Sequence, residues 1–206
     1  GHPFSLYLKE LNQFITTRLD KLLPQREPQL ITGVIHAIRT QMTKRGKMAI
    51  VTLDDGRARA DIVIYNEILV EHSGWLKEDR LLVAKAIIGN SMNDSNELRI
   101  TAEKLYDLAH ARSQYANKIR FTISQSSVDC QLVIPKLKEL IAASLPGAKG
   151  NIVPVQSVRC PVTIRYQNQQ AKCEIELGEA WHALLSDFFI ESVSQLFKPE
   201  NVEILY

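Results

Sequence analysis

Six basic side chains in a short part of the chain have the chemistry of a polyanion-binding surface. Between positions 39 and 59 they outnumber two acidic residues, although the net charge of the 206-residue chain is only +2. The six are Arg39, Lys44, Arg45, Lys47, Arg57 and Arg59. Long cationic side chains on a loop contact phosphates without reading base sequence. The pattern predicts salt-sensitive, sequence-tolerant binding of nucleic acid. A loop that is merely solvated is the alternative.

Two adjacent acids, Asp54 and Asp55, could bind a metal ion or act in acid–base catalysis. Two-metal chemistry needs carboxylates that converge on the same ions. Neighbouring residues of a strand point to opposite faces, whereas Asp-Asp-Gly ending at Gly56 is ordinary turn chemistry. We therefore expect a turn here rather than a catalytic centre.

The remaining chemically reactive residues form no recognisable site. The five histidines (His2, His36, His72, His110 and His182) lack metal-ligand spacing, and no serine or glycine motif of a hydrolase or phosphate loop is present. Three cysteines, Cys130, Cys160 and Cys173, are expected to be reduced and mostly buried, as in a cytosolic protein. The sequence predicts no catalytic residue, no metal and no cofactor.

The elements that position the basic cluster follow the order of an OB fold, a partly open Greek-key barrel. Residues 30–107 show five short β-branched or alternating segments, with a short helix between the third and the fourth. The expected strands are 30–39, 48–53, 58–65, 81–88 and 97–105, and the expected helix is 66–71. Such a barrel binds single strands through its second and third strands and the adjoining loops. The basic cluster falls on these parts.

Three further segments complete an α+β chain. Residues 1–29 predict an amphipathic helix and an extended linker that must dock on another part of the protein, and residues 108–118 predict a connecting helix. Residues 119–206 read as β-α-β-β-α-β, an order typical of a split βαβ, ferredoxin-like domain. They carry eight basic and nine acidic residues, so no polyanion site is expected there.

Several stretches give the chain a family resemblance. Gly-His-Pro at positions 1–3, Thr-Lys-Arg-Gly at 43–46, Leu-Asp-Asp at 53–55, Leu-Arg-Ile-Thr-Ala-Glu at 98–103 and Ala-His-Ala-Arg at 109–112 occur in this order. With these motifs the chain resembles the C-terminal region of the bacterial DNA polymerase III alpha subunit. The resemblance implies an OB domain that contacts single-stranded template DNA. It places the catalytic carboxylates of the polymerase outside this segment.

The resemblance also implies a docking role for residues 119–206. In that family the last domain binds the tau subunit of the clamp loader, next to the other replicase subunits and the rest of the alpha subunit. Large apolar residues gather near the end of this chain, where core packing competes with docking as the explanation. The expected docking residues are Phe189, Phe197, Ile204, Leu205 and Tyr206.

Two other functional classes fit parts of the pattern. The anticodon-binding OB domain of a class II aminoacyl-tRNA synthetase has a similar first strand and basic loop, but it adjoins a large catalytic domain for which residues 119–206 are too few. A scaffold that binds only protein is the third reading. No apolar run approaches the roughly 20 residues of a membrane span, and no secretory signal is evident, so we expect no membrane partner. The resemblance implies a bacterial cytoplasmic, nucleoid-associated protein.

Overall fold

The computed structural model describes residues 7–44, 46–91, 97–124, 130–145 and 158–206. The chain divides into two compact units, Gly1–Leu108 and Ala109–Tyr206, which are called the first and the second unit below. Each unit has a hydrophobic core of its own. Among the described residues, no helix is both long and apolar enough to cross a bilayer.

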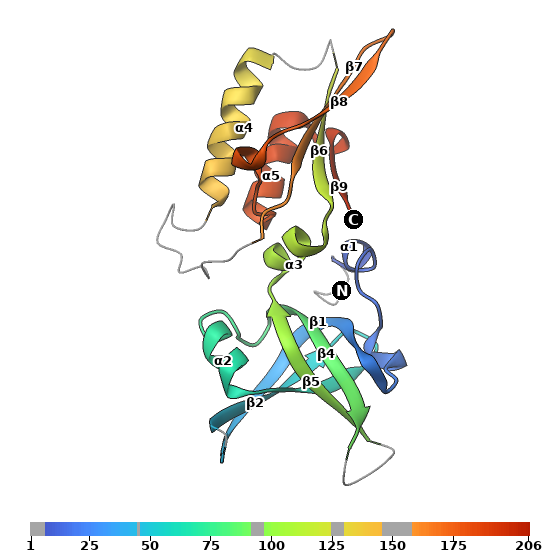
Figure 1. Cartoon of the computed structure of the whole chain (residues 1–206), viewed down its shortest axis with the longest axis vertical. Helices are drawn as coiled ribbons and strands as arrows, with labels where there is room; N and C mark the ends of the chain where they lie inside the picture. The colour runs from blue at the N-terminus through green and yellow to red at the C-terminus, as the bar shows by residue number, and fades with distance from the viewer. Residues whose placement is uncertain (1–6, 45, 92–96, 125–129, 146–157) are drawn as a thin grey trace. The chain divides into compact units, whose positions relative to one another are not determined.

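The first unit is a closed barrel of five strands in the order β1-β2-β3-β5-β4 (Figure 1). Its elements are β1 (Gln25–Thr43), β2 (Gly46–Asp54), β3 (Arg59–Ile64), α2 (Asn66–His72), β4 (Leu81–Asn90) and β5 (Leu98–Tyr106). All neighbouring strands are antiparallel except β3 and β5, whose short parallel pairing closes the barrel. This confirms the expected five-stranded OB fold with its helix between the third and fourth strands.

The long strand β1 belongs to both walls of the barrel. Its first part pairs with β4 and its second part with β2, and the change occurs next to Gly33. A Cβ atom on Gly33 would lie 3.0 Å from the Cβ of Leu53 and 3.1 Å from backbone atoms of Asp54. Glycine therefore allows the two strands to approach closely at this point.

Alternation of side chains separates the inside of the barrel from its outer face. On β2 and β3, Val51, Leu53, Ile62 and Ile64 are completely buried in the core. The residues between them point outward, because successive side chains of a strand lie on opposite faces. The outer face of β1, β2 and β3 therefore presents the intervening residues to solvent.

The lead-in segment packs on the barrel in short pieces. An amphipathic helix followed by an extended linker was expected, and the described part contains a short helix, α1 (Leu8–Leu11), and a 3-10 turn, η2 (Leu19–Lys21). Leu19 is buried in the barrel core, and the backbone N–H of Leu30 donates to Thr16 Oγ1 over 2.8 Å. These anchors require extended chain between them, which accounts for the short helix.

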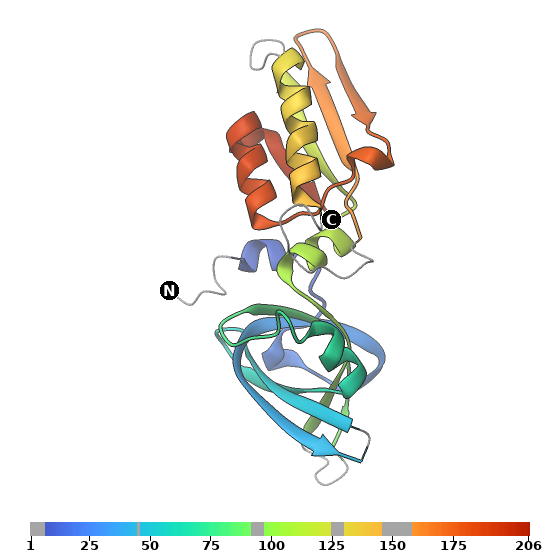
Figure 2. The same cartoon turned by 90° about the vertical axis from the view of Figure 1, so that its left-hand side faces the viewer.

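The second unit is a four-stranded sheet with two helices on one face (Figure 2). Its elements are α3 (Leu108–Tyr115), β6 (Lys118–Ser124), α4 (Cys130–Ser144), β7 (Val162–Gln167), β8 (Lys172–Glu176), η3 (Glu179–Trp181), α5 (Asp187–Phe197), η4 (Pro199–Asn201) and β9 (Val202–Leu205). Ser186 caps α5, with its Oγ accepting from the N–H of Phe189 over 3.1 Å. The helices cover the face from which Phe121 stacks on Phe197, with ring centroids 4.7 Å apart.

The order of helices and strands in the second unit agrees with the order predicted from the sequence. The predicted split βαβ, ferredoxin-like arrangement of the strands in the sheet is wrong. The strand order is β8-β7-β6-β9, and β6 and β7 pair directly in parallel from Ile119 opposite Val162 onward. No strand is inserted between the two strands that α4 connects. Instead, β8 adds to the outer edge of β7 as a hairpin, and β9 adds antiparallel to β6.

Helix α3 is tied to the second unit by its polar side chains. Arg112 is buried, and its Nη1 lies 2.5 Å from Asp187 Oδ1, at the start of α5. Ser113 Oγ accepts from the N–H of Leu185 over 3.0 Å. The segment that the sequence suggests as a connector therefore contributes to the fold of residues 109–206.

Candidate nucleic-acid interface

The turn between β1 and β2 presents two lysines that have no acidic partner among the described residues. Thr43 and Gly46 face each other across the end of the hairpin, where Thr43 Oγ1 donates to the carbonyl of Gly46 over 2.8 Å. Gly46 has a φ of +104°, the turn conformation that favours glycine. Lys44 and Lys47 are exposed, and neither forms an ion pair with a residue that the structure describes. Arg45, the third predicted contact of this loop, lies outside the described residues.

Two other predicted contacts, Arg39 and Arg59, are held by carboxylates on the same face. Arg39 Nη2 lies 2.7 Å from Asp61 Oδ2, and Arg59 Nε lies 2.7 Å from Asp54 Oδ2. The sequence did not predict these ion pairs, because the two partners of each pair come from different strands. Cross-strand register brings Asp54 opposite Arg59.

An apolar strip lies between these charges. Register places Arg39 opposite Ile50 and Ile50 opposite Val63, so that the two aliphatic side chains adjoin on the outer face. Both are partly exposed. At one end of this strip, Arg99 of β5 donates to the hydroxyl of Tyr65 over 2.6 Å. Arg99 was not among the contacts that the sequence predicts, although its outward position follows from the alternation of β5.

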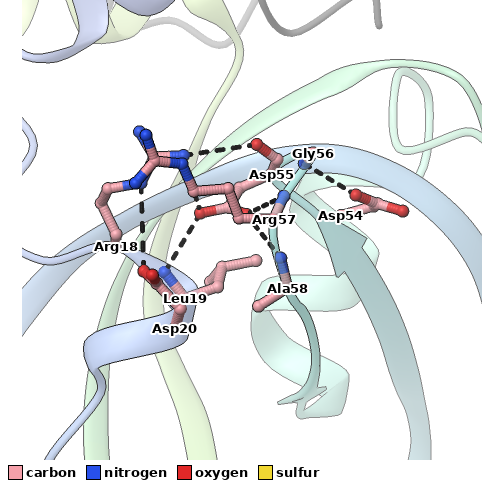
Figure 3. A network of polar contacts seen from close by, with 8 residues as sticks. All are labelled: Arg18, Leu19, Asp20, Asp54, Asp55, Gly56, Arg57 and Ala58. Atoms are coloured by element: carbon pink, nitrogen blue, oxygen red, sulfur yellow. Dashed lines mark hydrogen bonds and ion pairs between the residues drawn. The ribbon is translucent and has the colours of Figure 1, made fainter.

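Asp54 and Asp55 form the turn that the sequence predicts. Figure 3 shows that Asp55 points inward and is bound on several sides, whereas Asp54 accepts from the N–H of Gly56 over 2.8 Å. One carboxylate oxygen of Asp55 accepts from the N–H groups of Arg57 and Ala58, each over 2.9 Å. The two carboxylates are therefore committed to structural contacts, and no group of three or more potential metal ligands occurs among the described residues.

Arg57, the sixth predicted contact, projects from this turn. Its side chain is exposed and makes no ion pair within the described part of the chain. Arg57 lies at the β2–β3 turn, whereas Lys44 and Lys47 lie at the β1–β2 turn, at the other end of β2. The predicted cations thus occur at both ends of the strip rather than at a single point.

The expected docking residues of the second unit fall into two groups. Phe189 and Phe197 are 1% and 0% exposed, so their assignment to a docking surface is wrong; they form the core with Phe121 instead. Ile204, Leu205 and Tyr206 are half-buried. The large aromatic side chain that α5 does expose is Phe188, at 60%. Helical rotation separates it from its buried neighbour Phe189 by about 100°.

Two titratable groups of the second unit have strongly shifted pKa values. Burial raises the pKa of the Cys160 thiol to about 12, so this buried cysteine stays protonated, whereas Cys173 is exposed. The pKa of Glu174 falls to about 2, mainly because Lys118 donates to it and also because Arg165 and Arg120 lie nearby. Nζ of Lys118 is 2.5 Å from Oε1 of Glu174. The carboxylate of Glu174 on β8 therefore links cations of β6 and β7 across the sheet.

Comparison with known proteins shows what the chain is similar to. Residues 30–108 match the model of the OB-fold nucleic acid binding domain. The DNA polymerase III subunit alpha of Vibrio cholerae is 31% identical over 208 residues, and that of Escherichia coli K12 is 29% identical over 209 residues. Each alignment covers 99% of this chain but only 17% of the relative, so the chain spans about one sixth of their length.

Similarity to solved structures is weaker. The second OB-fold domain of replication protein A from Methanococcus maripaludis has a TM-score of 0.35 and 13% identity, and the match covers 45% of this chain and 95% of that domain. RecG bound to a three-way DNA junction has a TM-score of 0.37 and 15% identity, with coverage of 48% and 15%. Scores this low support no inference about function. The curated relatives, in contrast, show that nearly the whole chain is similar to one segment of the bacterial DNA polymerase III alpha subunit, and residues 30–108 match an OB-fold nucleic acid binding domain.

Proposed function

We propose that this chain is a non-catalytic segment of a replicative DNA polymerase alpha subunit and that its barrel binds single-stranded template DNA. The observation that carries the proposal is the pair of exposed lysines, Lys44 and Lys47, at the β1–β2 hairpin, from which β2 continues to Ile50 of the apolar strip. The polymerisation reaction belongs to other parts of such a subunit, in the bacterial cytoplasm at the nucleoid. The role of this segment is to hold the strand.

The chemistry of the face favours a single strand over a duplex. Bases in a single strand expose their flat apolar faces, which pack on side chains such as Ile50, Val63 and Tyr65, whereas a duplex buries these faces in its own stack. The lysines at the hairpin supply the phosphate contacts. Since neither kind of contact reads a base edge, the binding is tolerant of sequence.

The test is a change of charge at the hairpin. In the full 206-residue chain, Lys44→Ala with Lys47→Ala should weaken binding of labelled oligo-dT about tenfold and make the salt slope shallower by about 1.4, since each single-strand phosphate contact contributes about 0.7. The matched control is Lys77→Ala with Arg80→Ala. Both cations are exposed, and the carbonyl of Arg80 accepts from the N–H of Ile35, at the other end of the β1–β2 pairing from the hairpin. Equal affinities of the two double variants, measured by fluorescence anisotropy at two salt concentrations, would contradict the proposal.

The two alternative functions predict different outcomes. An anticodon-binding domain of a tRNA synthetase would bind an anticodon stem-loop in preference to oligo-dT. The match of 99% of this chain to polymerase subunits favours the polymerase assignment. A scaffold that binds only protein would give no salt-dependent anisotropy with either nucleic acid.

For the second unit, we propose docking of the tau subunit of the clamp loader, next to the other replicase subunits and the rest of the alpha subunit. Support comes from the last strand. β9 pairs with β6 on one side and has no other strand partner among the described residues. Leu205 stands opposite Lys118 on the sheet face that the helices leave open, and it takes no part in the core. A partner can therefore reach both the strand edge and this side chain.

This docking proposal is tested without deleting the strand, because loss of β9 would disturb the sheet. Leu205→Ser should reduce capture of purified tau by the full chain several-fold. Ile175→Ser is the matched control, since Ile175 is 54% exposed on β8 at the opposite edge of the sheet. Undiminished capture by Leu205→Ser, with its fold confirmed by thermal unfolding, would exclude this edge as the tau site.

A further inference from the structure

We infer that Asp54 and Asp61 limit the affinity of the barrel for single-stranded nucleic acid by holding the two strand arginines of the binding face in internal ion pairs. The inference rests on the proposed function and adds to it a pair of residues that weaken binding. Neither acid is needed to build the interior of the barrel, since both lie on its outer face. Their positions next to phosphate-binding cations call for a separate explanation.

The first pair is fully accessible to a ligand. The side chains of Arg39 and Asp61 are 66% and 49% exposed, and 2.7 Å separates the guanidinium from the carboxylate. Thr52 orients the acid from the neighbouring strand by donating to its other oxygen over 2.5 Å. Because exposed ion pairs contribute little to folding, an approaching phosphate can compete with this carboxylate for Arg39.

The second ion pair joins Arg59 of β3 to Asp54, its register partner on β2. Arg59 Nε lies 2.7 Å from Asp54 Oδ2, and the arginine side chain is 57% exposed. The bond runs from Nε of Arg59, so a phosphate that approaches this guanidinium also meets the negative charge of Asp54 beside it.

The cations of the hairpin and those of the outer face therefore fall into two groups. Lys44 and Lys47 have no acidic partner among the described residues, whereas Arg39 and Arg59 each have one within 3 Å. The lysines therefore make the main phosphate contacts, and the arginines contribute little net charge. A segment that must let template DNA move through it gains from such weakened binding, because release is then fast.

The experiment neutralises the acids while keeping their hydrogen bonds. In the full chain, Asp54→Asn retains an oxygen for the N–H of Gly56, and Asp61→Asn retains one for Thr52. Removing one negative charge about 6 Å from a bound phosphate should raise affinity for oligo-dT about threefold, and the double variant should gain about tenfold. The salt slope should become steeper by up to about 1.4, because two arginines then release counterions.

The control has the same change of net charge at a remote place. Glu27 is exposed on the part of β1 that pairs with β4, and it has no ion pair within the described residues. Glu27→Gln should leave affinity and slope almost unchanged. If Asp54→Asn lowers the stability of the turn, Asp61→Asn alone decides the question, because Asp61 takes no part in a turn.

The outcomes separate this inference from the proposed function. If the two hairpin lysines prove necessary but the asparagine variants behave like Glu27→Gln, the barrel binds DNA and the inference is wrong. If no variant binds oligo-dT, including the double asparagine variant, both fail. A gain confined to Asp54→Asn and Asp61→Asn supports the inference, also when the unsubstituted chain binds too weakly to measure.

Discussion

The guanidinium of Arg18 lies 3.3 Å from the carboxylate of Asp55, and this pair joins the lead-in segment to the β2–β3 turn of the barrel. Asp55 is 4% exposed and also accepts from the backbone N–H of Leu19 over 3.3 Å (Figure 3). One side chain therefore bonds to two parts of the chain that are more than thirty residues apart. Buried carboxylates need several donors, because a charge without partners in the interior is costly.

Asp55→Ala is therefore expected to destabilise the first unit by about 2–4 kcal/mol, since three backbone N–H groups and Arg18 lose their acceptor. Urea unfolding monitored by circular dichroism measures the effect. Asp20→Ala is the control, because this acid lies 4.0 Å from Arg18 and is one third exposed. Similar unfolding midpoints for the two variants would show that the network around Asp55 contributes little.

Gly33→Ala tests the close approach of β1 and β2. The added methyl group would lie 3.1 Å from backbone atoms of Asp54, which cannot move without shifting the strand. We expect a loss of about 1–3 kcal/mol in the free energy of unfolding, as for an overpacked core. Gly89→Ala is the matched change, because nothing lies within 4 Å of a Cβ atom on that strand residue. The expectation fails if the two glycines tolerate alanine equally.

Phe197→Ala and Phe188→Ala separate core packing from exposure on one helix. Phe197 is completely buried against Phe121, so its truncation should cost about 3–5 kcal/mol in the unfolding of the second unit. Phe188 is 60% exposed, and its truncation should change stability by no more than about 0.5 kcal/mol. Chemical denaturation of both variants is the measurement. A large loss for Phe188→Ala would mean that its ring is packed rather than free.

The stability of the second unit should depend on pH through Glu174. Its pKa in the folded chain is about 2, below the ordinary value of 4.5, because Lys118, Arg165 and Arg120 favour the carboxylate. A lowered pKa adds stability above pH 4.5, and this contribution is lost as the pH falls from about 4.5 to about 2. Glu174→Gln should flatten the pH dependence of unfolding in this range.

Glu176→Gln is the control for that titration, because it removes a carboxylate from the same strand without touching the cations around Glu174. NMR titration of the Glu174 side chain checks the pKa directly. A titration midpoint near 4.5 would show that the three cations do not lower the pKa of Glu174 when the protein is in solution.

Local patterns were enough to predict the barrel. The strands around Val51 and Ile62 alternate with period two, and Gly46 and Gly56 follow polar residues at the turns, so strand order and hairpin positions could be read from the residues alone. The six candidate cations could also be found this way, because exposed charges at turns need no knowledge of distant residues.

Contacts between distant segments were decided by the tertiary structure. Asp61 reaches Arg39 across 22 positions, and Arg18 reaches Asp55 across 37. Which strand lies beside β6, and whether Phe189 or Phe188 faces the core, depends on how the helices cross over the sheet. Periodicity shows which side of a helix or strand is buried. The residues that it contacts on that side are fixed only when the whole chain packs, because each core residue touches several others from distant parts of the chain.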